Sequence, residues 1–146
     1  MSAQRSQTAF SLTYAVQCSI RAEPQVVWAR LTDASAYPTW NTTITRLDGE
    51  ITLGSRLAIE VPIAPGRVFR PRVVEWSPPS RMVWRDGNPM FRGTRTFELT
   101  PDEGGTRFAM HERFGGLMLP MIRGSLPDFR EPFDRFASDL RRACEG

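Results

Sequence analysis

The first part of the chain alternates apolar and polar residues without a break. Residues 10–21 place six residues that suit a core on one side of an extended chain, and polar or small residues on the other. A period of two over this length predicts a β-strand with one buried face. The six residues are Phe10, Leu12, Tyr14, Val16, Cys18 and Ile20.

The spacing then changes to that of a helix. Pro24 suits the first turn of a helix, where its missing N–H removes no hydrogen bond. Val27, Trp28 and Leu31 follow at helical spacing, so residues 24–32 are predicted to form a short helix. A second short helical turn is expected around residues 36–40.

After these helices the chain returns to short extended segments. Turns rich in glycine and proline separate them, which predicts consecutive antiparallel strands with short connections. Together with the first strand they predict a seven-stranded sheet. The segments are residues 44–51, 56–61, 67–76, 81–85, 91–99 and 106–114.

The C-terminal segment is predicted to be a long helix. Asp128 or Ser125 is expected to cap it. Pro132 would kink a helix interior, so either the regular helix begins near Pro132 or residues 117–131 form a separate, angled turn that leads into it. The apolar stripe of this helix is Phe129, Phe133, Phe136 and Leu140.

These elements predict an α+β domain in which a curved antiparallel sheet wraps around the long C-terminal helix. The apolar face of such a sheet needs a cover. One helix is only about 10 Å wide, which is too narrow to cover seven strands. Side chains, the two short helices or a ligand are expected to fill the remaining space.

Composition narrows the class of protein. The 146 residues suit one domain spanning residues 1–146. Neither a signal-peptide pattern nor a membrane-spanning apolar run is present, so a cytoplasmic protein without stable membrane insertion is expected. The 19 basic residues are all arginine, which excludes Schiff-base chemistry on lysine. They are scattered singly, so no nucleic-acid partner is expected despite a net charge of +3. Cys18 and Cys144 are interpreted as reduced and structural.

Several short motifs follow one another along the chain. They are IRAEP at residues 20–24, VW at 27–28, LTD at 31–33, YPTWN at 37–41, Gly49 and Gly54, the Pro78-Pro79 turn before Val83-Trp84, FELTP at 97–101, GTRF at 105–108 and ERFGGL at 112–117. In this order they resemble the SRPBCC superfamily, which includes START domains, birch-pollen-allergen-like proteins and polyketide cyclase/dehydrase-like proteins. The resemblance implies a helix-grip fold with a deep apolar pocket. Its members bind lipids, sterols, plant hormones or polyketides, and some are enzymes.

Two charged residues share the inward faces of the last two predicted strands. Phe91, Phe97 and Leu99 identify the inward face that includes Arg95, and Phe108, Met110 and Phe114 identify the one that includes Glu112. If Pro101 pairs with Thr106, Arg95 lies directly opposite Glu112; a slip of two residues makes them diagonal neighbours. Either register predicts an ion pair inside the cavity, because an unpaired buried charge is unfavourable. The pair is either a structural salt bridge or a polar handle for a ligand.

Large aromatic residues on the inward faces suit a planar or polycyclic ligand. The facing of residues 67–76 is open, because Phe69 and Val73 compete with Val74 and Trp76 for the inward side. Arg70 or Arg72 is then a further inward candidate. The predicted ligand-binding residues are Tyr14, Trp40, Leu57, Ile59, Trp84, Phe91, Arg95, Phe97, Met110, Glu112, Phe114, Phe129 and Phe133.

Few residues could carry catalysis. His111 is the only histidine, and by parity it faces away from the pocket, which excludes an internal catalytic triad and a multi-histidine metal site. Glu112 is the best general acid or base candidate, with Arg95 beside it and with Tyr14 or Asp33 as weaker candidates. Three aspartates in turn-like contexts are interpreted as solvated. They are Asp48, Asp86 and Asp102. No cofactor and no metal is expected.

The Gly115-Gly116 pair precedes an apolar segment that ends at Ile122. This segment is predicted to gate ligand entry, with a simple packed corner as the alternative. Three functions follow for the chain: a binding protein for a lipid, polyketide or aromatic molecule; a polyketide cyclase, aromatase or dehydratase that uses Glu112 and Arg95; or a co-chaperone-like protein-interaction module. A monomer and a homodimer are both compatible with the sequence.

Overall fold

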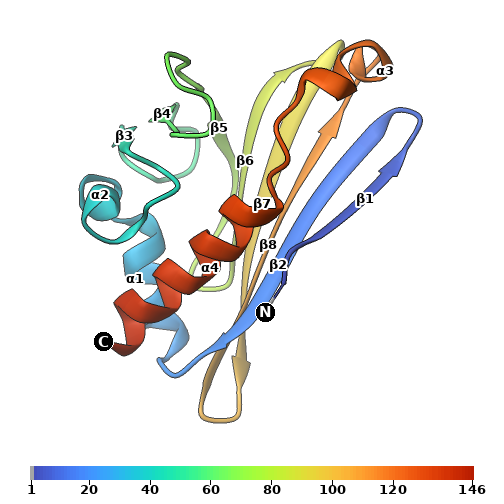
Figure 1. The fold of residues 1–146 in the computed structure, drawn as a ribbon. Coiled ribbons are helices and arrows are strands. Elements are labelled where there is room, and N and C mark those ends of the chain that lie inside the picture. Colours follow the sequence, from blue (N-terminus) through green and yellow to red (C-terminus); the bar gives the residue numbers. More distant parts are fainter. Residues whose placement is uncertain (1) are drawn as a thin grey trace.

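A large antiparallel sheet forms the framework of the protein (Figure 1). The computed structural model describes residues 2–146. The main sheet has six strands in the order β1-β2-β8-β7-β6-β5, and a separate two-stranded sheet pairs β3 with β4. The strands are β1 (Gln4–Thr8), β2 (Ser11–Ile20), β3 (Arg46–Asp48), β4 (Ala58–Glu60), β5 (Arg72–Ser77), β6 (Arg81–Asn88), β7 (Phe91–Asp102) and β8 (Gly105–Gly115). The predicted α+β class is confirmed.

The arrangement of the strands differs from a single seven-stranded sheet. The segments predicted at 44–51 and 56–61 form only short strands, which pair with each other and reach the region of β5 through isolated bridges such as Ile59–Phe69. Strand β1 lies outside the predicted segments, because the polar residues Gln4–Thr8 show no alternation with apolar ones, and in the structure all five are exposed. It is held as an edge strand by pairing with β2, from Gln4–Ala15 to Thr8–Ser11.

The alternation in β2 places its apolar side chains in the core as predicted, with one exception. Leu12, Tyr14 and Val16 are buried, but Phe10 precedes the strand and is exposed. The turn between β1 and β2 occupies residues 9–10, so the side chain of Phe10 lies at the end of a hairpin and not over the sheet. Phe10 is therefore a surface residue.

Two short helical segments follow β2. Helix α1 (Pro24–Thr32) begins at the predicted proline, and Val27, Trp28 and Leu31 are its buried residues. A 3₁₀ turn, η1 (Ala34–Ala36), leads into α2 (Tyr37–Trp40). The buried hydroxyl of Tyr37 donates a hydrogen bond to the carbonyl oxygen of Leu31 over 2.7 Å, which ties α2 to α1.

The long C-terminal helix α4 (Arg130–Glu145) crosses the concave face of the sheet (Figure 1). The helix begins at Arg130, so the regular helix starts near Pro132, as in the first of the two alternatives. Pro132 is the third residue of the helix, where the backbone N–H of any residue would have no partner within the helix, so the proline removes no hydrogen bond. The N-cap is Phe129, which makes no side-chain capping hydrogen bond, so neither Asp128 nor Ser125 caps the helix as predicted. Asp128, one residue before the N-cap, accepts a hydrogen bond from the backbone N–H of Arg130 over 3.0 Å. The chain before it forms α3 (Leu119–Ile122) and the 3₁₀ turn η2 (Arg123–Ser125).

The core lies between α4 and the sheet. Phe136 is fully buried and stacks on Phe108 of β8, with ring centroids 6.1 Å apart and planes 8° apart. Phe133 and Leu140 are buried on the same stripe, whereas Phe129 is only partly buried. Among residues 2–146, no helix has the length and apolar character needed to cross a membrane.

Candidate functional site

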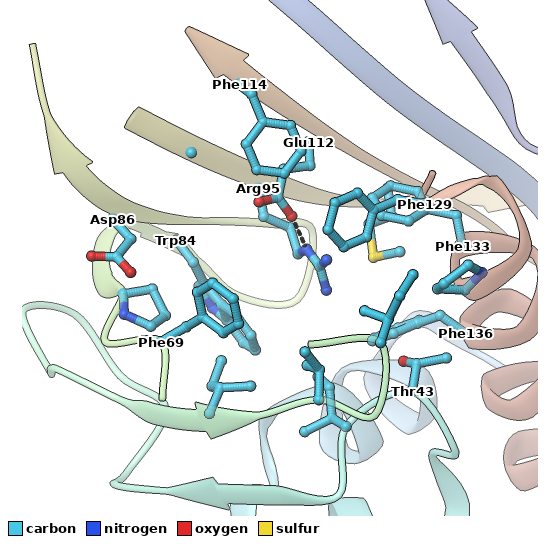
Figure 2. A pocket seen from close by; sticks show the side chains of 18 of the residues that line it. Thr43, Phe69, Trp84, Asp86, Arg95, Glu112, Phe114, Phe129, Phe133 and Phe136 are labelled. Atoms are coloured by element: carbon cyan, nitrogen blue, oxygen red, sulfur yellow. Dashed lines mark hydrogen bonds and ion pairs between the residues drawn. The ribbon is translucent and has the colours of Figure 1, made fainter. Parts of the chain in front are cut away.

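A cavity of about 310 Å³ separates α4 from the inner face of the sheet (Figure 2). Three parts of the chain form its walls. The sheet contributes Trp84, Asp86, Gly87, Phe91, Gly93, Arg95, Met110, Glu112 and Phe114; the helix side contributes Phe129, Pro132, Phe133 and Phe136; and the β3–β5 region contributes Thr43, Ile44, Ile59, Val61, Ile63, Arg67, Phe69 and Pro71. The volume falls at the small end of ligand sites in proteins, which span roughly 300–1,000 Å³.

Arg95 and Glu112 form an ion pair on the wall of this cavity. They lie directly opposite each other in the register of β7 and β8, which is the first of the two registers considered from the sequence. The Nε of Arg95 donates to Oε1 of Glu112 over 2.7 Å. Both side chains are largely buried, with 19% and 16% of their surface exposed. The inner faces of the two strands thus bring opposite charges together within an apolar wall.

The aromatic rings of α4 cover the guanidinium of Arg95. Its Cζ lies 5.1 Å from the ring centroid of Phe133 and 6.0 Å from that of Phe136. A cation near an aromatic face is attracted by the ring quadrupole. Arg95 is therefore held from two sides, by the Glu112 carboxylate and by the helix.

Two further charges line the cavity. Arg67 lies over the ring of Phe69, with 5.2 Å between its Cζ and the ring centroid. Asp86 accepts a hydrogen bond from the backbone N–H of Arg70 over 3.2 Å. The prediction that Asp86 is a solvated turn residue is wrong: β6 continues to Asn88, so Asp86 is opposite Gly93 on the inner face. With Arg95 and Glu112, the charges on the cavity wall sum to zero.

The facing of residues 67–76 is explained by an irregularity in β5. The register with β6 shifts between Val73 and Glu75. Val73 faces inward opposite Trp84, and after the shift Trp76 also faces inward, opposite Met82. A bulge inserts one residue and so reverses the alternation. Val73 and Trp76, which belong to the two competing faces, therefore both face inward. Arg70 and Arg72 are exposed.

Nine of the thirteen predicted ligand-binding residues line the cavity: Ile59, Trp84, Phe91, Arg95, Met110, Glu112, Phe114, Phe129 and Phe133. The other four do not. Tyr14 and Phe97 are fully buried, Tyr14 against Phe129 and Phe133 and Phe97 beneath Phe136 and Trp84. Trp40 packs edge-on against Phe136, and Leu57, just before β4, is a buried residue of the core. These residues face inward as predicted, but neighbouring side chains fill the space in front of them.

The wall formed by residues 61–71 is the main part that the sequence did not assign to the site. This stretch contains Ile63, Arg67 and Pro71, which bound the cavity opposite α4. Its apolar residues are separated by Pro62, Pro65 and Gly66, so they follow no helical or strand period. Phe69 is the one residue of this wall with a usable signal, a large aromatic side chain in a predicted strand.

The remaining candidates lie outside the cavity. His111 is on the outer face, between Thr96 and Ala15 of the neighbouring strands, as its parity predicted. The hydroxyl of Tyr14 accepts from Nε of Arg5 and donates to the carbonyl oxygen of Pro127. Asp33 accepts a hydrogen bond from the hydroxyl of Ser35 beyond the end of α1. Within residues 2–146, no three histidine, cysteine, aspartate or glutamate side chains converge as metal ligands would.

Cys18 and Cys144 are half-buried and unpaired. Burial raises the pKa of the Cys144 thiol to about 11, and burial also raises that of Cys18. A thiol with a raised pKa carries little thiolate at neutral pH and is a poor nucleophile. Both positions are compatible with the structural interpretation.

Comparisons with known proteins now define the class. The fold is that of helix-grip proteins, and the family described as "Polyketide cyclase / dehydrase and lipid transport" matches residues 11–145. The chain belongs to this family, which lies within the SRPBCC group that the sequence motifs resemble. A search of curated proteins finds no match.

Solved structures share the fold at low sequence identity. A protein of Rhodobacter sphaeroides is 23% identical, with a TM-score of 0.70 over 97% of this chain and 96% of its own. The Helicobacter pylori hypothetical protein jhp0584 is 14% identical, with a TM-score of 0.71 over 90% of this chain and 86% of its own. The di-domain ARO/CYC protein BexL of the BE-7585A biosynthetic pathway is 12% identical, with a TM-score of 0.68 over 96% of this chain and 52% of its own.

Proposed function

We propose that the protein binds a small hydrophobic molecule, such as a lipid, a polyketide or an aromatic compound, in the cavity between the sheet and α4. The observation that carries this proposal is an apolar space of about 310 Å³ with one ion pair on its wall. Apolar pockets with a few convergent polar groups are the usual form of small-molecule sites. Family membership agrees with this reading.

Arg95 gives the ligand a polar contact. Its Nε is used by Glu112, and among residues 2–146 no hydrogen bond to its terminal nitrogens is present. These nitrogens carry N–H groups that suit a ligand oxygen. Because the four charges on the wall already sum to zero, the proposed ligand is uncharged and carries a carbonyl or hydroxyl oxygen at one end.

Gly93 supplies space next to this contact. A Cβ added at Gly93 would lie 3.1 Å from Oε2 of Glu112 and 3.5 Å from the ring of Phe114, inside the cavity wall. Gly93→Val therefore narrows the proposed site while keeping Arg95. Gly115→Val in β8 is a matched control, because its Cβ would contact only the carbonyl oxygen of Phe10, at 3.5 Å.

Native mass spectrometry of the purified protein tests the proposal. We expect the wild type and Gly115→Val to retain a small apolar molecule that denaturation releases, and Gly93→Val to retain much less. Retention by Gly93→Val equal to that of the wild type would contradict the proposed site. Equal loss in both variants, with unfolding midpoints unchanged from the wild type, would also contradict it, because retention would then not depend on the cavity wall at Gly93.

A second candidate is an enzyme that uses Glu112 as acid or base on a polyketide-like substrate, with Arg95 as the positioning group. The observation that favours it is a carboxylate on the mostly apolar wall of the cavity, with 16% of its side chain exposed. Glu112→Gln preserves the shape of the side chain and removes the proton-transfer group. An enzyme would lose orders of magnitude in rate with binding retained, whereas a carrier would keep its function with a modest loss of affinity.

A further inference from the structure

Exposed apolar side chains gather at one end of the molecule. Of the eight large hydrophobic residues that are exposed among those described, five belong to the β1–β2 turn, the β6–β7 turn and the segment at α3. Figure 1 shows these three segments together at the upper end of the sheet. We call this surface the apolar tip; it consists of Phe10, Met90, Leu117, Met118 and Met121.

Hydrogen bonds fix the three segments to one another. The backbone N–H of Met118 donates to the carbonyl oxygen of Met90 over 2.9 Å. Arg123 reaches from η2 to the β1–β2 turn, where it donates to the carbonyl oxygens of Thr8 and Ala9. Gly116 permits this approach: its φ is +126°, and a Cβ there would lie 2.4 Å from the carbonyl oxygen of Met90. The tip is therefore a defined surface held by backbone hydrogen bonds and by the side chain of Arg123.

Within the tip, exposure is highest at the segment that contains α3. Leu117 is 65% exposed and Met121 is 79% exposed. Leu119, between them, is fully buried and anchors α3 to the core. Leu117 and Met121 are thus held in contact with water. Covering these two side chains with another apolar surface would lower the free energy.

Unpaired arginines adjoin the tip on the outer face of the sheet. Arg92 is two residues from Met90 and lies opposite Gly87 and Gly115. Arg85 and Arg113 occupy the next row, one on each side of Thr94. None of these three arginines takes part in an ion pair with the described residues.

No carboxylate offsets this charge. The two outer-face rows nearest the tip run Gly87, Arg92, Gly115, Ser11 and Thr8, and then Arg72, Arg85, Thr94, Arg113, Thr13 and Ser6. The neighbouring acids Asp86 and Glu112 belong to the inner face, where they line the cavity. An apolar tip that is basic along its outer face matches the surface of a bilayer, which is apolar inside and negatively charged outside.

We propose that the apolar tip docks on the surface of an anionic lipid bilayer. Phe10, Leu117 and Met121 enter the interfacial region, and Arg85, Arg92 and Arg113 contact lipid phosphates. The contact is peripheral, since α3 has only four residues. The cavity adjoins the docked surface, because Phe91 follows Met90 and Phe114 precedes Gly115. A ligand dissolved in the bilayer could then enter the cavity directly from the membrane, with little contact with water on the way.

Vesicle cosedimentation tests the docking, and it does not depend on the ligand. The vesicles contain phosphatidylcholine, either alone or with a quarter of phosphatidylglycerol. We expect the wild-type protein to bind the anionic vesicles and to bind pure phosphatidylcholine much more weakly. Raising the salt concentration should weaken the binding, because charges at the surface are screened.

Two pairs of double variants separate the apolar and basic contributions. Leu117→Ser with Met121→Ser should lower vesicle binding about tenfold or more, whereas Val26→Ser with Leu53→Ser, exposed away from the tip, should leave it unchanged. Arg85→Gln with Arg113→Gln should lower it roughly 25-fold, since each arginine near an anionic surface contributes about fivefold. Arg30→Gln with Arg141→Gln removes the same charge from α1 and α4 and should lower it less.

Several results would overturn docking at the tip. Wild-type protein that fails to bind anionic vesicles would do so, as would equal losses in the tip variants and their controls. Sedimentation velocity without lipid gives a further check. A wild-type dimer that Leu117→Ser with Met121→Ser converts to a monomer would assign the tip to a second copy of the chain. The ligand retained in the cavity is measured separately, so failure of docking leaves that result intact.

Discussion

Arg95 and Glu112 face each other across adjacent strands inside the protein, with 2.7 Å between Nε and Oε1. Each is surrounded by apolar side chains of the cavity wall. If either residue were removed, the other would remain as a buried charge with neither an opposite charge nor full hydration, which is unfavourable. The same ion pair therefore contributes to the stability of the fold and forms the polar part of the cavity wall.

Glu112→Ala should destabilise the protein by about 2–4 kcal/mol, because it leaves the guanidinium of Arg95 without its carboxylate. Replacing both residues, as in Arg95→Met with Glu112→Leu, should restore most of that loss, since no charge is left unpaired. Urea unfolding of Arg95→Met, of Glu112→Leu and of the double variant measures the coupling. Additive losses in the double variant would show that the two side chains do not act as a pair.

Phe136→Ala should lower the free energy of unfolding by about 3–5 kcal/mol. The ring is fully buried and contacts Tyr37, Phe97 and Phe108, so its removal enlarges the cavity and leaves these rings unsupported. Arg135→Ala, on the exposed side of the same helix, should change the stability by less than about 0.5 kcal/mol. Thermal unfolding of the two variants compares them. Similar losses in both would contradict the placement of the helix.

Gly87 and Gly104 should respond differently to alanine although both have a positive φ, +98° and +80°. A Cβ at Gly87 would lie 2.2 Å from the carbonyl oxygen of Phe91, whereas none of the neighbouring atoms lies within 4 Å at Gly104. We expect Gly104→Ala to lose about 1 kcal/mol, and Gly87→Ala to lose distinctly more because the hairpin must shift. Equal midpoints of urea unfolding for Gly87→Ala and Gly104→Ala would contradict the close contact between Gly87 and the carbonyl oxygen of Phe91.

Acid should weaken the start of α4. Hydrogen bonds from Arg130 lower the pKa of Asp128 from 3.8 to about 2. A carboxylate whose pKa is lower in the folded state stabilises the protein above its unfolded pKa, and this contribution disappears as the pH falls through the folded pKa. Stability should therefore decline between about pH 4 and pH 2, and Asp128→Asn should show a shallower decline. Unfolding midpoints across this pH range provide the comparison.

The register of the β7–β8 hairpin was accessible from sequence because its loop and its alternating residues agree. Leu99 and Phe108 define the inward faces, so parity placed Arg95 and Glu112 together in either of the two registers considered, and the structure has the register in which they are directly opposite. The start of α1 was equally accessible, since Pro24 marks it. Local chemistry and hydrophobic period point to the same answer at these places.

Other parts depend on contacts that no local pattern encodes. The shift after Val73 reverses the facing of Trp76, and only the pairing with β6 reveals it. Strand β1 has no apolar face and forms because the edge of β2 is available. Asp86 was assigned to a turn because Gly87 follows it, yet the strand continues past that glycine. In each case a neighbouring strand overrides the local signal.

The same distinction applies to the cavity. Residues such as Phe97 and Tyr14 were correctly expected to face inward, but inward residues either line a space or fill it, and only their packing decides which. The wall at residues 61–71 has no periodic pattern and becomes part of the cavity because β4 and β5 bring it opposite α4. The existence of a cavity followed from the mismatch between a broad sheet and a narrow helix, whereas its boundary did not.

Isothermal titration calorimetry with N-phenyl-1-naphthylamine, an uncharged aromatic compound, tests the cavity most directly. Wild-type protein should bind one molecule, with a negative change in heat capacity because apolar surface is buried. Gly115→Val should bind equally well, and Gly93→Val should bind at least tenfold more weakly. Absence of binding to the wild type, or binding that is unchanged by Gly93→Val, would contradict a ligand site between the sheet and α4.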